Sequence, residues 1–349
     1  MTRSTSRPQP EPATLRVGGV LEILAVLKQF KVDPDEVLTA VGIDSGLLDD
    51  PDNLITYDAR GHLLNQCVAQ TGCQHFGLLL GQRMNLRSLG LTGLLMKTSR
   101  NTGAALRGLV NYLHLHTQGA VTTLRVDCGL AVLSYESVRP NAVASEQTGD
   151  GAVAMMLNVM RALCGPKFQP LEASFARRSP ADIEPFRKFF QCPVYFNADR
   201  FALLFSHDWL EIHPPSADAD LQRWLQKQAD ALSSKRTEEF PEQVRRVLRS
   251  SLLTGHCSEE QVAALFSMHA RSLGRRLQAS GVSFRELTDQ CRFDIAQEML
   301  RNTSLSVGQI GTSLDYSRAS AFIRAFRRWS GSTPAQWRTA HASHVQMPQ

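Results

Sequence analysis

The stretch YSRASAFIRAFRRWSG, Tyr316 to Gly331, combines an apolar helical pattern with a cluster of arginines. Its apolar residues recur at i, i+3, i+4 and i+7 and would share one helix face: Phe322, Ala325, Phe326 and Trp329. The arginines point largely elsewhere: Arg318, Arg324, Arg327 and Arg328. A solvated helix face usually carries both signs of charge, yet no Asp or Glu follows Asp315 in the chain. We therefore predict that the apolar face is core, with no base-stacking role, and that the arginines meet an anionic partner.

Positive charge is concentrated in the last third of the chain. Residues 241–349 hold 14 arginines and no lysine against 8 acidic residues, a net charge of +6. The whole chain of 349 residues has 38 basic and 33 acidic residues, so 1–240 holds 24 and 25, a net charge of −1. The length and a hydrophobic content of 43% allow two or three globular domains, of which the last is basic.

Cysteine usage and the N-terminal sequence indicate the compartment. Seven cysteines are scattered without a C-x-x-C pair, which argues against a disulfide framework or a zinc site. The first 14 residues lack the apolar core of a signal peptide, and no apolar run approaches the roughly 18 residues that span a bilayer. We expect reduced thiols and a soluble cytoplasmic protein that makes no membrane contact.

Residues 15–212 show a mixed pattern that predicts an α+β domain. Helical periodicity recurs in four segments: 17–30, 58–71, 102–116 and 145–163. Two strand-like runs, at 121–126 and 130–138, are separated by Asp127, Cys128 and Gly129, which suits a hairpin. The remaining expected elements are two extended segments and an amphipathic segment between them: 171–177, 201–206 and 183–190.

The rest of the chain is divided by composition. Residues 1–14 are rich in Pro, Ser and Thr and predict a disordered tail. The Pro-containing, polar segment at 213–237 predicts a linker that contains a connecting helix at 221–232. No strand pattern follows Phe240, so 238–341 predicts an all-α domain, with 342–349 as a tail.

The last third contains a weak internal duplication. The segment 262–268 lines up with 310–316 at an offset of 48, and 272–277 lines up with 320–326 within one residue of an offset of 49. Each copy predicts a short helix, a turn of three or four residues and a longer arginine-bearing helix. The domain therefore contains two helix-turn-helix units.

The ends of the longer helices carry recognisable signals. Gly281 and Gly331 follow them, as expected at a left-handed C-terminal position. Ser317 is a good N-cap for the second copy, whereas His269 is a poorer cap in the equivalent place of the first.

One continuous helix is predicted between the two copies, at 283–301. Its apolar residues lie three or four apart: Phe284, Leu287, Cys291, Ile295 and Met299. At about 1.5 Å per residue this helix is roughly 28 Å long. That length is comparable with the ~34 Å between successive major-groove faces on one side of B-DNA. The spacing fits two units in adjacent major grooves.

The second copy also carries a family signature: Ile310-Gly311, Leu314-Asp315-Tyr316-Ser317, Ser320, Phe322, Arg324 to Trp329, Gly331, Pro334 and Arg338. It resembles the C-terminal signature of the AraC/XylS family of bacterial transcription regulators. The stretch VAALFSMHARSLGRRLQASGVSFRELTDQCR, at 262–292, is similar to the upstream unit and linker helix of that family. The resemblance covers about a hundred residues and implies sequence-specific binding of double-stranded DNA, with RNA polymerase as a further partner.

Three positions depart from the family pattern. Asp315 occupies a turn position where the family generally has Gly, and Asp tolerates the left-handed conformation better than most side chains. Arg318 stands where an acidic residue is common, and Gly274 stands at a recognition-helix position usually given to a side chain. The last two departures are expected to alter which bases are read.

The N-terminal domain has a less specific resemblance. LGLTGLLMKTSRNTGAALRGLVNYLHLH at 89–116 and PVYFNADRFALLFSHDWL at 193–210 are similar to the sensing domain of an ornithine-utilisation-regulator-like subgroup of the family. The similarity implies a domain that binds a small-molecule effector and often forms a homodimer. We expect an activator controlled by such an effector, whose identity and binding residues no motif gives.

Roles for the arginines follow from their positions. Arginine early in a recognition helix pairs bidentately with guanine, and arginines further along reach phosphates. Base contacts are predicted for six residues: Arg271, Arg275, Arg318, Ala319, Ile323 and Arg324. Phosphate contacts are predicted for four: Arg276, Arg327, Arg328 and Arg338. The alternatives are an internal salt bridge for Arg275 and Arg324, and simple solvation for Arg327 and Arg328.

Rival chemistry finds weak support, so no catalytic residue, metal site or cofactor is expected. His114 and His116 form an H-x-H pair, but on the predicted helix they lie about 200° apart. The stretch GLLLGQR, at 77–83, lacks the Lys-Ser/Thr ending and preceding strand of a phosphate-binding loop. The alternatives kept are a constitutive regulator whose N-terminal domain is only a dimerisation scaffold, and an enzyme domain fused to a DNA reader.

Overall fold

The computed structural model describes residues 13–137, 143–234, 239–253, 258–266, 268–303, 305–316 and 318–341. The predicted cap Ser317, the thiol of Cys257, the tail at 342–349 and most of the tail at 1–14 lie outside these residues. The chain forms two compact units, Met1–Lys235 and Arg236–Gln349. We describe each unit by itself.

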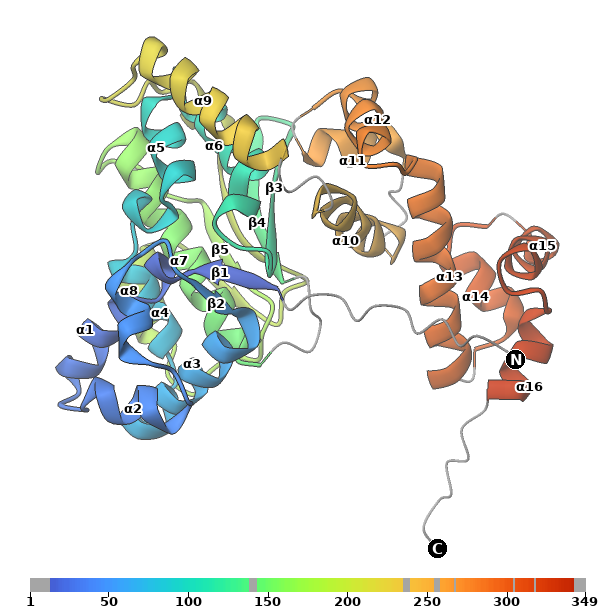
Figure 1. Ribbon diagram of the computed structural model, residues 1–349, viewed down its shortest axis with the longest axis horizontal. Helices are drawn as coiled ribbons and strands as arrows, with labels where there is room; N and C mark the ends of the chain where they lie inside the picture. The colour runs from blue at the N-terminus through green and yellow to red at the C-terminus, as the bar shows by residue number, and fades with distance from the viewer. Residues whose placement is uncertain are drawn as a thin grey trace, which may run out of the picture. The chain divides into compact units, whose positions relative to one another are not determined.

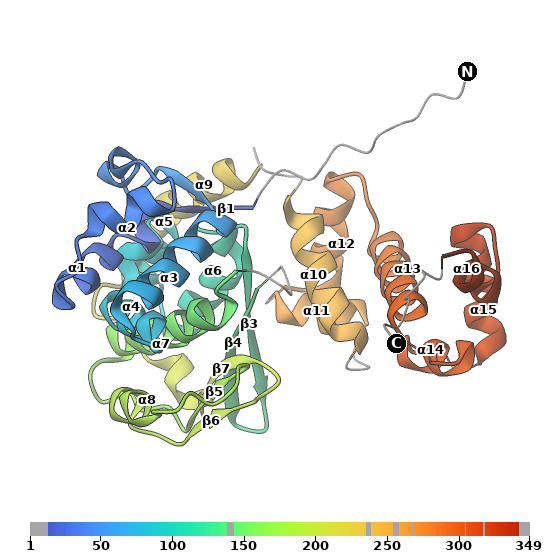
Figure 2. The same ribbon diagram turned by 90° about the horizontal axis from the view of Figure 1, so that it is seen from below.

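The first unit, which Figure 1 shows with the strands β3, β4 and β5 labelled, contains a five-stranded sheet in the order β3-β4-β7-β5-β6, and Figure 2 labels all five strands. Its strands are β3 (Ala120–Asp127), β4 (Leu130–Ser137), β5 (Glu172–Phe175), β6 (Val194–Phe196) and β7 (Phe201–Ser206). All neighbours are antiparallel except β5 and β6. The predicted hairpin is confirmed, because Cys128 and Gly129 turn with φ of 47° and 80° between β3 and β4, as a tight two-residue turn requires.

Helices of the first unit pack against this sheet, and the four predicted periodic segments are all helical. They correspond to α1 (Glu22–Gln29), α3 (Tyr57–Thr71), α6 (Thr102–Tyr112) and α7 (Ser145–Cys164), and the amphipathic segment is α8 (Glu184–Phe190). The sequence analysis missed six short elements: β1 (Thr14–Arg16), β2 (Leu54–Thr56), β6, α2 (Pro34–Ala40), α4 (Phe76–Arg83) and α5 (Leu91–Thr98). The α+β prediction for this region is confirmed.

Helix α7 packs against β4 and β7 and, along its length, against α4 (Figure 2). Two glycines of the GLLLGQR stretch allow the close approach. A Cβ atom at Gly77 would lie 2.0 Å from the backbone oxygen of Gln147, and one at Gly81 would lie 2.3 Å from that of Gly151. These glycines therefore serve helix packing.

Helix α9 (Ala219–Ser234) occupies most of the segment that we expected to be a linker. Its buried Leu225 and Ala229 form a small apolar cluster with Leu95 of α5 and Tyr112 of α6. The helix that the sequence predicted is present, and it packs onto the first unit.

The second unit is all helical, as predicted. It comprises α10 (Glu239–Leu253), α11 (Glu259–Leu265), α12 (Ala270–Ala279), α13 (Phe284–Asn302), α14 (Val307–Ser313), α15 (Ala319–Ser330) and α16 (Pro334–His341). Helices α11 and α14 begin 48 residues apart, and α12 and α15 begin 49 apart, so the duplication is real. Four residues separate α11 from α12 and five separate α14 from α15, one more than predicted, because Arg318 is still extended.

The predicted linker helix is α13, which connects the two helix-turn-helix units (Figure 1). Ser283 and Glu286 close a capping box at its start. The glycines after α12 and α15 are left-handed, with φ of 76° at Gly281 and 78° at Gly331. Asp315 has φ of 63°, so the Asp at this position keeps the left-handed turn.

Candidate nucleic-acid interface

Helix α15 is anchored by the apolar face that its sequence predicts. Phe322 and Phe326 are fully buried, and Ala325 is nearly so. The ring centroid of Phe326 lies 5.4 Å from that of Phe293 on α13 and 6.1 Å from that of Trp337 on α16. Trp329 was assigned to the core, but it is only half-buried. It lies at the edge of this cluster, with its ring centroid 5.9 Å from that of Phe293.

The arginines of α15 lie on the opposite side and are exposed. Within the described part of the chain, Arg318, Arg324 and Arg327 have no hydrogen bond or ion pair from their side chains. Arg318 is the extended N-cap residue of the helix, and its side chain makes no cap bond. An exposed guanidinium without an internal partner is available to an external anion.

The equivalent helix of the first copy, α12, presents Arg271 and Arg275 one turn apart on an exposed face. Neither has an ion pair among the described residues, so the internal salt bridge considered for Arg275 and Arg324 is not formed there. His269 begins α12 without a side-chain cap bond, as expected of a poorer cap. Gly274 faces α11, where a Cβ atom would lie 3.1 Å from Glu259 Oε1.

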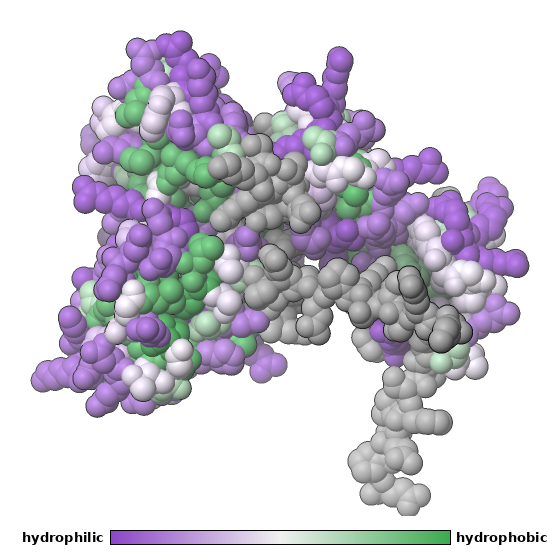
Figure 3. Space-filling model, in the orientation of Figure 1, coloured by the Kyte–Doolittle hydropathy of each residue, from purple (hydrophilic) through white to green (hydrophobic). Residues whose placement is uncertain are grey.

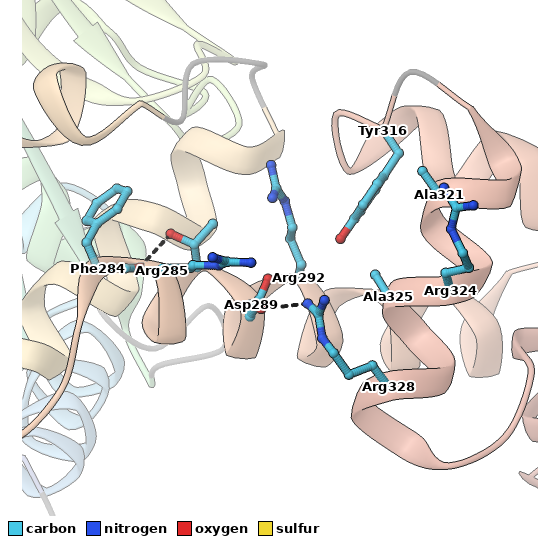
Figure 4. A pocket seen from close by; sticks show the side chains of 10 residues that line it. Phe284, Arg285, Asp289, Arg292, Tyr316, Ala321, Arg324, Ala325 and Arg328 are labelled. Carbon is cyan, nitrogen blue, oxygen red and sulfur yellow. Dashed lines mark hydrogen bonds and ion pairs between the residues drawn. The ribbon is translucent and has the colours of Figure 1, made fainter.

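A groove of about 580 Å³ lies between α13 and α15 (Figure 4). Its charged lining comprises four arginines and one carboxylate: Arg285, Arg292, Arg324, Arg328 and Asp289. Arg292 of α13 lies over the ring of Tyr316 at 5.2 Å from its centroid. The excess of positive charge gives the groove a field that attracts an anion.

Three of the four arginines predicted to contact phosphates have internal contacts. Arg276 lies over the ring of Phe240 at 4.0 Å, and Arg338 donates from Nη2 to the carbonyl oxygen of Leu305 at 2.5 Å. Arg328 Nη2 lies 2.8 Å from Asp289 Oδ2. That ion pair is largely exposed, so its contribution is about 0–1 kcal/mol and a phosphate competes with it easily.

Sequence reasoning missed the contribution of α13 to this groove. Arg285, Asp289 and Arg292 lie at i, i+4 and i+7, so they share one face of a helix that was predicted correctly. That spacing was the available signal. Hydrophilic side chains also cover most of the visible surface around α12 and α15 (Figure 3).

Two helix-turn-helix units joined by one helix, each with exposed and unpaired arginines on its second helix, define a DNA-binding protein. Residues 262–340 match a helix-turn-helix domain model, and residues 32–213 match the model described as the arabinose-binding domain of AraC transcription regulator, N-terminal. The second of these matches spans more than half of the chain, so the protein belongs to the AraC family of transcription regulators. It is a DNA-binding regulator and not an enzyme.

Individual relatives span nearly the whole chain. The protein is 26% identical to the ornithine utilization regulator of Pseudomonas aeruginosa, over 91% of this chain and 94% of the relative. It is also 26% identical to the HTH-type transcriptional regulator VirS of Mycobacterium tuberculosis, over 90% and 93%. The crystal structure of the transcriptional regulator CdpR from Pseudomonas aeruginosa aligns at 20% identity with a TM-score of 0.44, over 87% of this chain and 96% of that one.

The described residues show neither a membrane span nor a metal site. No helix there is long and apolar enough to cross a bilayer. The same residues contain no cluster of three or more His, Cys, Asp or Glu side chains with the arrangement of a metal site. The H-x-H pair is split, since His114 Nε2 lies 2.9 Å from Ser233 Oγ and His116 lines a cavity.

That cavity lies inside the first unit and measures about 90 Å³. Its walls come from β1, α3, α4, α6, α7, β3 and β4, and most of its lining residues are apolar. No sequence period brings these segments together, so the sequence analysis gave no location for it. Burial, together with the nearby Arg16 and Arg60 guanidinium groups, lowers the pKa of His116 to about 3.

We expect this histidine to make the first unit acid-sensitive. Folding lowers the pKa of His116 from the ordinary 6.5, so the neutral ring is favoured in the folded state. The stability that this ring contributes is therefore complete above pH 6.5 and is lost as the pH falls towards 3. Between pH 6.5 and 5 the free energy of unfolding should fall by about 1.5 kcal/mol. Denaturant unfolding of wild type and His116→Gln checks this, with His213→Gln, an exposed histidine, as control. Equal pH dependence in wild type and His116→Gln would contradict the assignment.

Proposed function

We propose that this regulator is an activator that reads two adjacent major grooves with α12 and α15, under the control of a small-molecule effector held by the N-terminal domain. The domain limits we adopt are 15–212 for the sensing domain and 238–341 for the DNA reader. The observation that carries the proposal is the pair of equivalent helices, both with unpaired arginines, in two helix-turn-helix units that α13 connects. That 19-residue helix is about 28 Å long, close to the ~34 Å repeat of the major groove.

The positions of the side chains support separate roles for α15 residues. Arg318, Ala319 and Arg324 are exposed at or near the start of the helix, where a recognition helix meets base edges. Arg327 is also exposed but lies one turn later, where phosphate contacts are expected. Arg328 adds a second phosphate contact when its guanidinium group leaves Asp289 and pairs with a phosphate of the DNA backbone.

Control by an effector is supported by the first unit. A domain of about 200 residues with a nearly neutral charge contributes nothing that DNA binding itself needs. An effector regulates only if it binds the active arrangement more tightly than the silent one, since equal affinity shifts nothing. The activator would act in the cytoplasm with RNA polymerase as its partner, as a homodimer.

Substitutions on α15 should separate the two kinds of DNA contact. Arg324→Ala should relax the preference at one or two base pairs, at a cost of roughly 1–3 kcal/mol, because a base-reading guanidinium is lost. Arg328→Ala should weaken binding to all sequences about equally. Affinities for a library of single-base operator variants provide the measurement.

Arg83→Ala is a matched control for Arg328→Ala, because Arg83 also forms one exposed ion pair, with Glu22, but lies in the first unit. It should leave both affinity and preference unchanged. Indistinguishable preference profiles for Arg324→Ala and Arg328→Ala would show that the division between base and phosphate contacts is wrong.

Effector control is tested with transcription from the natural operator. A compound that raises the melting temperature of the full-length protein should change transcription at matching concentrations. The N-terminal domain is a dimerisation scaffold if no metabolite in a broad set raises the melting temperature or changes transcription, and if deletion of the first unit leaves regulation unchanged.

A further inference from the structure

The cavity of the first unit has a charged polar end. Arg60 of α3 reaches it, donates from Nη2 to Thr148 Oγ1 at 2.8 Å, and lies 4.5 Å from the ring centroid of Tyr57. The Tyr57 and Tyr135 hydroxyl groups are 2.5 Å apart beside it. The Nε of Arg60 is buried and has no hydrogen-bond partner.

Among the residues that the structure describes, this positive charge has no counter-charge. No Asp or Glu lines the cavity, and Arg60 forms no ion pair within the described residues. A charge removed from water is costly unless it is paired. Arg60 is partly buried and its Nε is fully so, and an anion in the cavity would therefore lower the free energy of this site.

His116 provides a second unpartnered polar atom at the same cavity. The residue is 7% exposed, and its Nδ1 is buried without a hydrogen-bond partner. The charged groups near it are both cations, Arg16 of β1 and Arg60 of α3, so the ring is held neutral. A neutral imidazole offers one donor nitrogen to an anion without adding a charge.

Most of the remaining lining is apolar and adaptable. It includes five leucines, one valine and three methionines: Leu15, Leu64, Leu80, Leu109, Leu113, Val159, Met84, Met155 and Met156. Methionine side chains rearrange readily around different shapes. An apolar cavity of about 150 Å³ holds benzene, so this one of about 90 Å³ holds roughly four non-hydrogen atoms as it stands. A longer ligand fits once the methionines move.

We propose that this cavity is the effector site and that its ligand is a short-chain aliphatic monocarboxylate, with the carboxylate on Arg60 and His116 and the chain among the leucines and methionines. The inference rests on the proposed effector control of this protein. A free amino acid fits poorly, because its ammonium group would face a guanidinium with no acidic side chain in the lining. A dicarboxylate would place its second charge among apolar side chains.

The test is binding of sodium pentanoate to the full-length protein by calorimetry, against pentanamide, which has the same chain and no charge. Pentanoate should bind saturably and at least tenfold more tightly than pentanamide. Arg60→Met should reduce pentanoate affinity about 10- to 100-fold, as expected for a lost hydrogen bond to a charged group. Arg60→Lys should retain part of that affinity, and Arg83→Met, which changes an exposed arginine, should bind like wild type.

A second variant covers the case in which Arg60→Met fails to fold. Val159→Phe keeps the polar end intact and fills the apolar end, so it should abolish pentanoate binding. Equal affinity for acid and amide, equal loss in the Arg60 and Arg83 variants, or no binding of pentanoate at tens of millimolar would overturn the proposal.

Measurement of transcription distinguishes the proposed carboxylate site from the proposed control by an effector. If pentanoate binds through Arg60 and transcription does not change, the carboxylate site stands and effector control through it fails. If a different metabolite controls transcription and carboxylates do not bind, effector control stands and the carboxylate site is wrong.

Discussion

Raising the salt concentration fourfold, from about 50 to about 200 mM, should weaken DNA binding by the full-length protein about a thousandfold. Each phosphate neutralised by an arginine releases condensed counterions from DNA. About six such contacts give a slope near −5 in a plot of log affinity against log salt concentration. Arg327→Ala removes one exposed, unpaired guanidinium and should reduce the steepness of the slope by about 1.

Fluorescence anisotropy with a labelled duplex at five or more salt concentrations provides the measurement. Arg83→Ala serves again as the control and should leave the slope unchanged. A flat response over this range would contradict an interface built on arginine and phosphate.

Phe326→Ala should lower the free energy of unfolding of the second unit by about 3–5 kcal/mol. The side chain is fully buried and contacts aromatic rings of α13, α15 and α16, so its loss opens a cavity at the centre of the second helix-turn-helix unit. Amide hydrogen exchange in α15 should accelerate roughly 150-fold or more, since 1.4 kcal/mol corresponds to a factor of ten.

The matched control is Phe30→Ala, because Phe30 is 38% exposed in the first unit and should change stability little. Loss of less than about 1 kcal/mol in Phe326→Ala would show that this aromatic cluster does not hold the recognition helix in place.

Much of the second unit was predictable because local signals and tertiary packing agree there. The duplication of α11-α12 in α14-α15 is visible as offsets of 48 and 49, and α13 has both a capping box and a continuous apolar stripe. The buried faces of Phe322 and Phe326 followed from spacing alone. The left-handed turn at Asp315 was expected from the family resemblance, which places Gly there, together with the tolerance of Asp for positive φ.

The failures lie where a residue's role depends on segments far away in the sequence. The internal contacts of Arg276 with Phe240 and of Arg338 with the carbonyl of Leu305 had no sequence signal, whereas the phosphate contacts of both arginines stay predictions. Helix α4 was missed because its glycines, which weaken a helical prediction, are required by contact with α7. Short strands such as β1 and β2 carry too few residues to show a period.

The effector cavity was invisible for the same reason. Its walls extend from Leu15 to Val159, and the chemistry of Arg60 becomes unusual only when Tyr57, Tyr135 and Thr148 surround it. A single arginine in a helix gives no sequence signal of being unpaired. Only the assembled structure shows that this cation has no counter-charge among the described residues.

The central claim is that α12 and α15 read one DNA site together, and the most direct measurement is selection of the genomic DNA that the full-length protein retains, followed by footprinting of the selected sites. The claim predicts one enriched sequence class with two protected elements about one helical turn apart, on the same side of the duplex. Arg275→Ala should erase preference in one element and Arg324→Ala in the other. Retention of genomic fragments without enrichment, or a single element that responds to both substitutions, would contradict it.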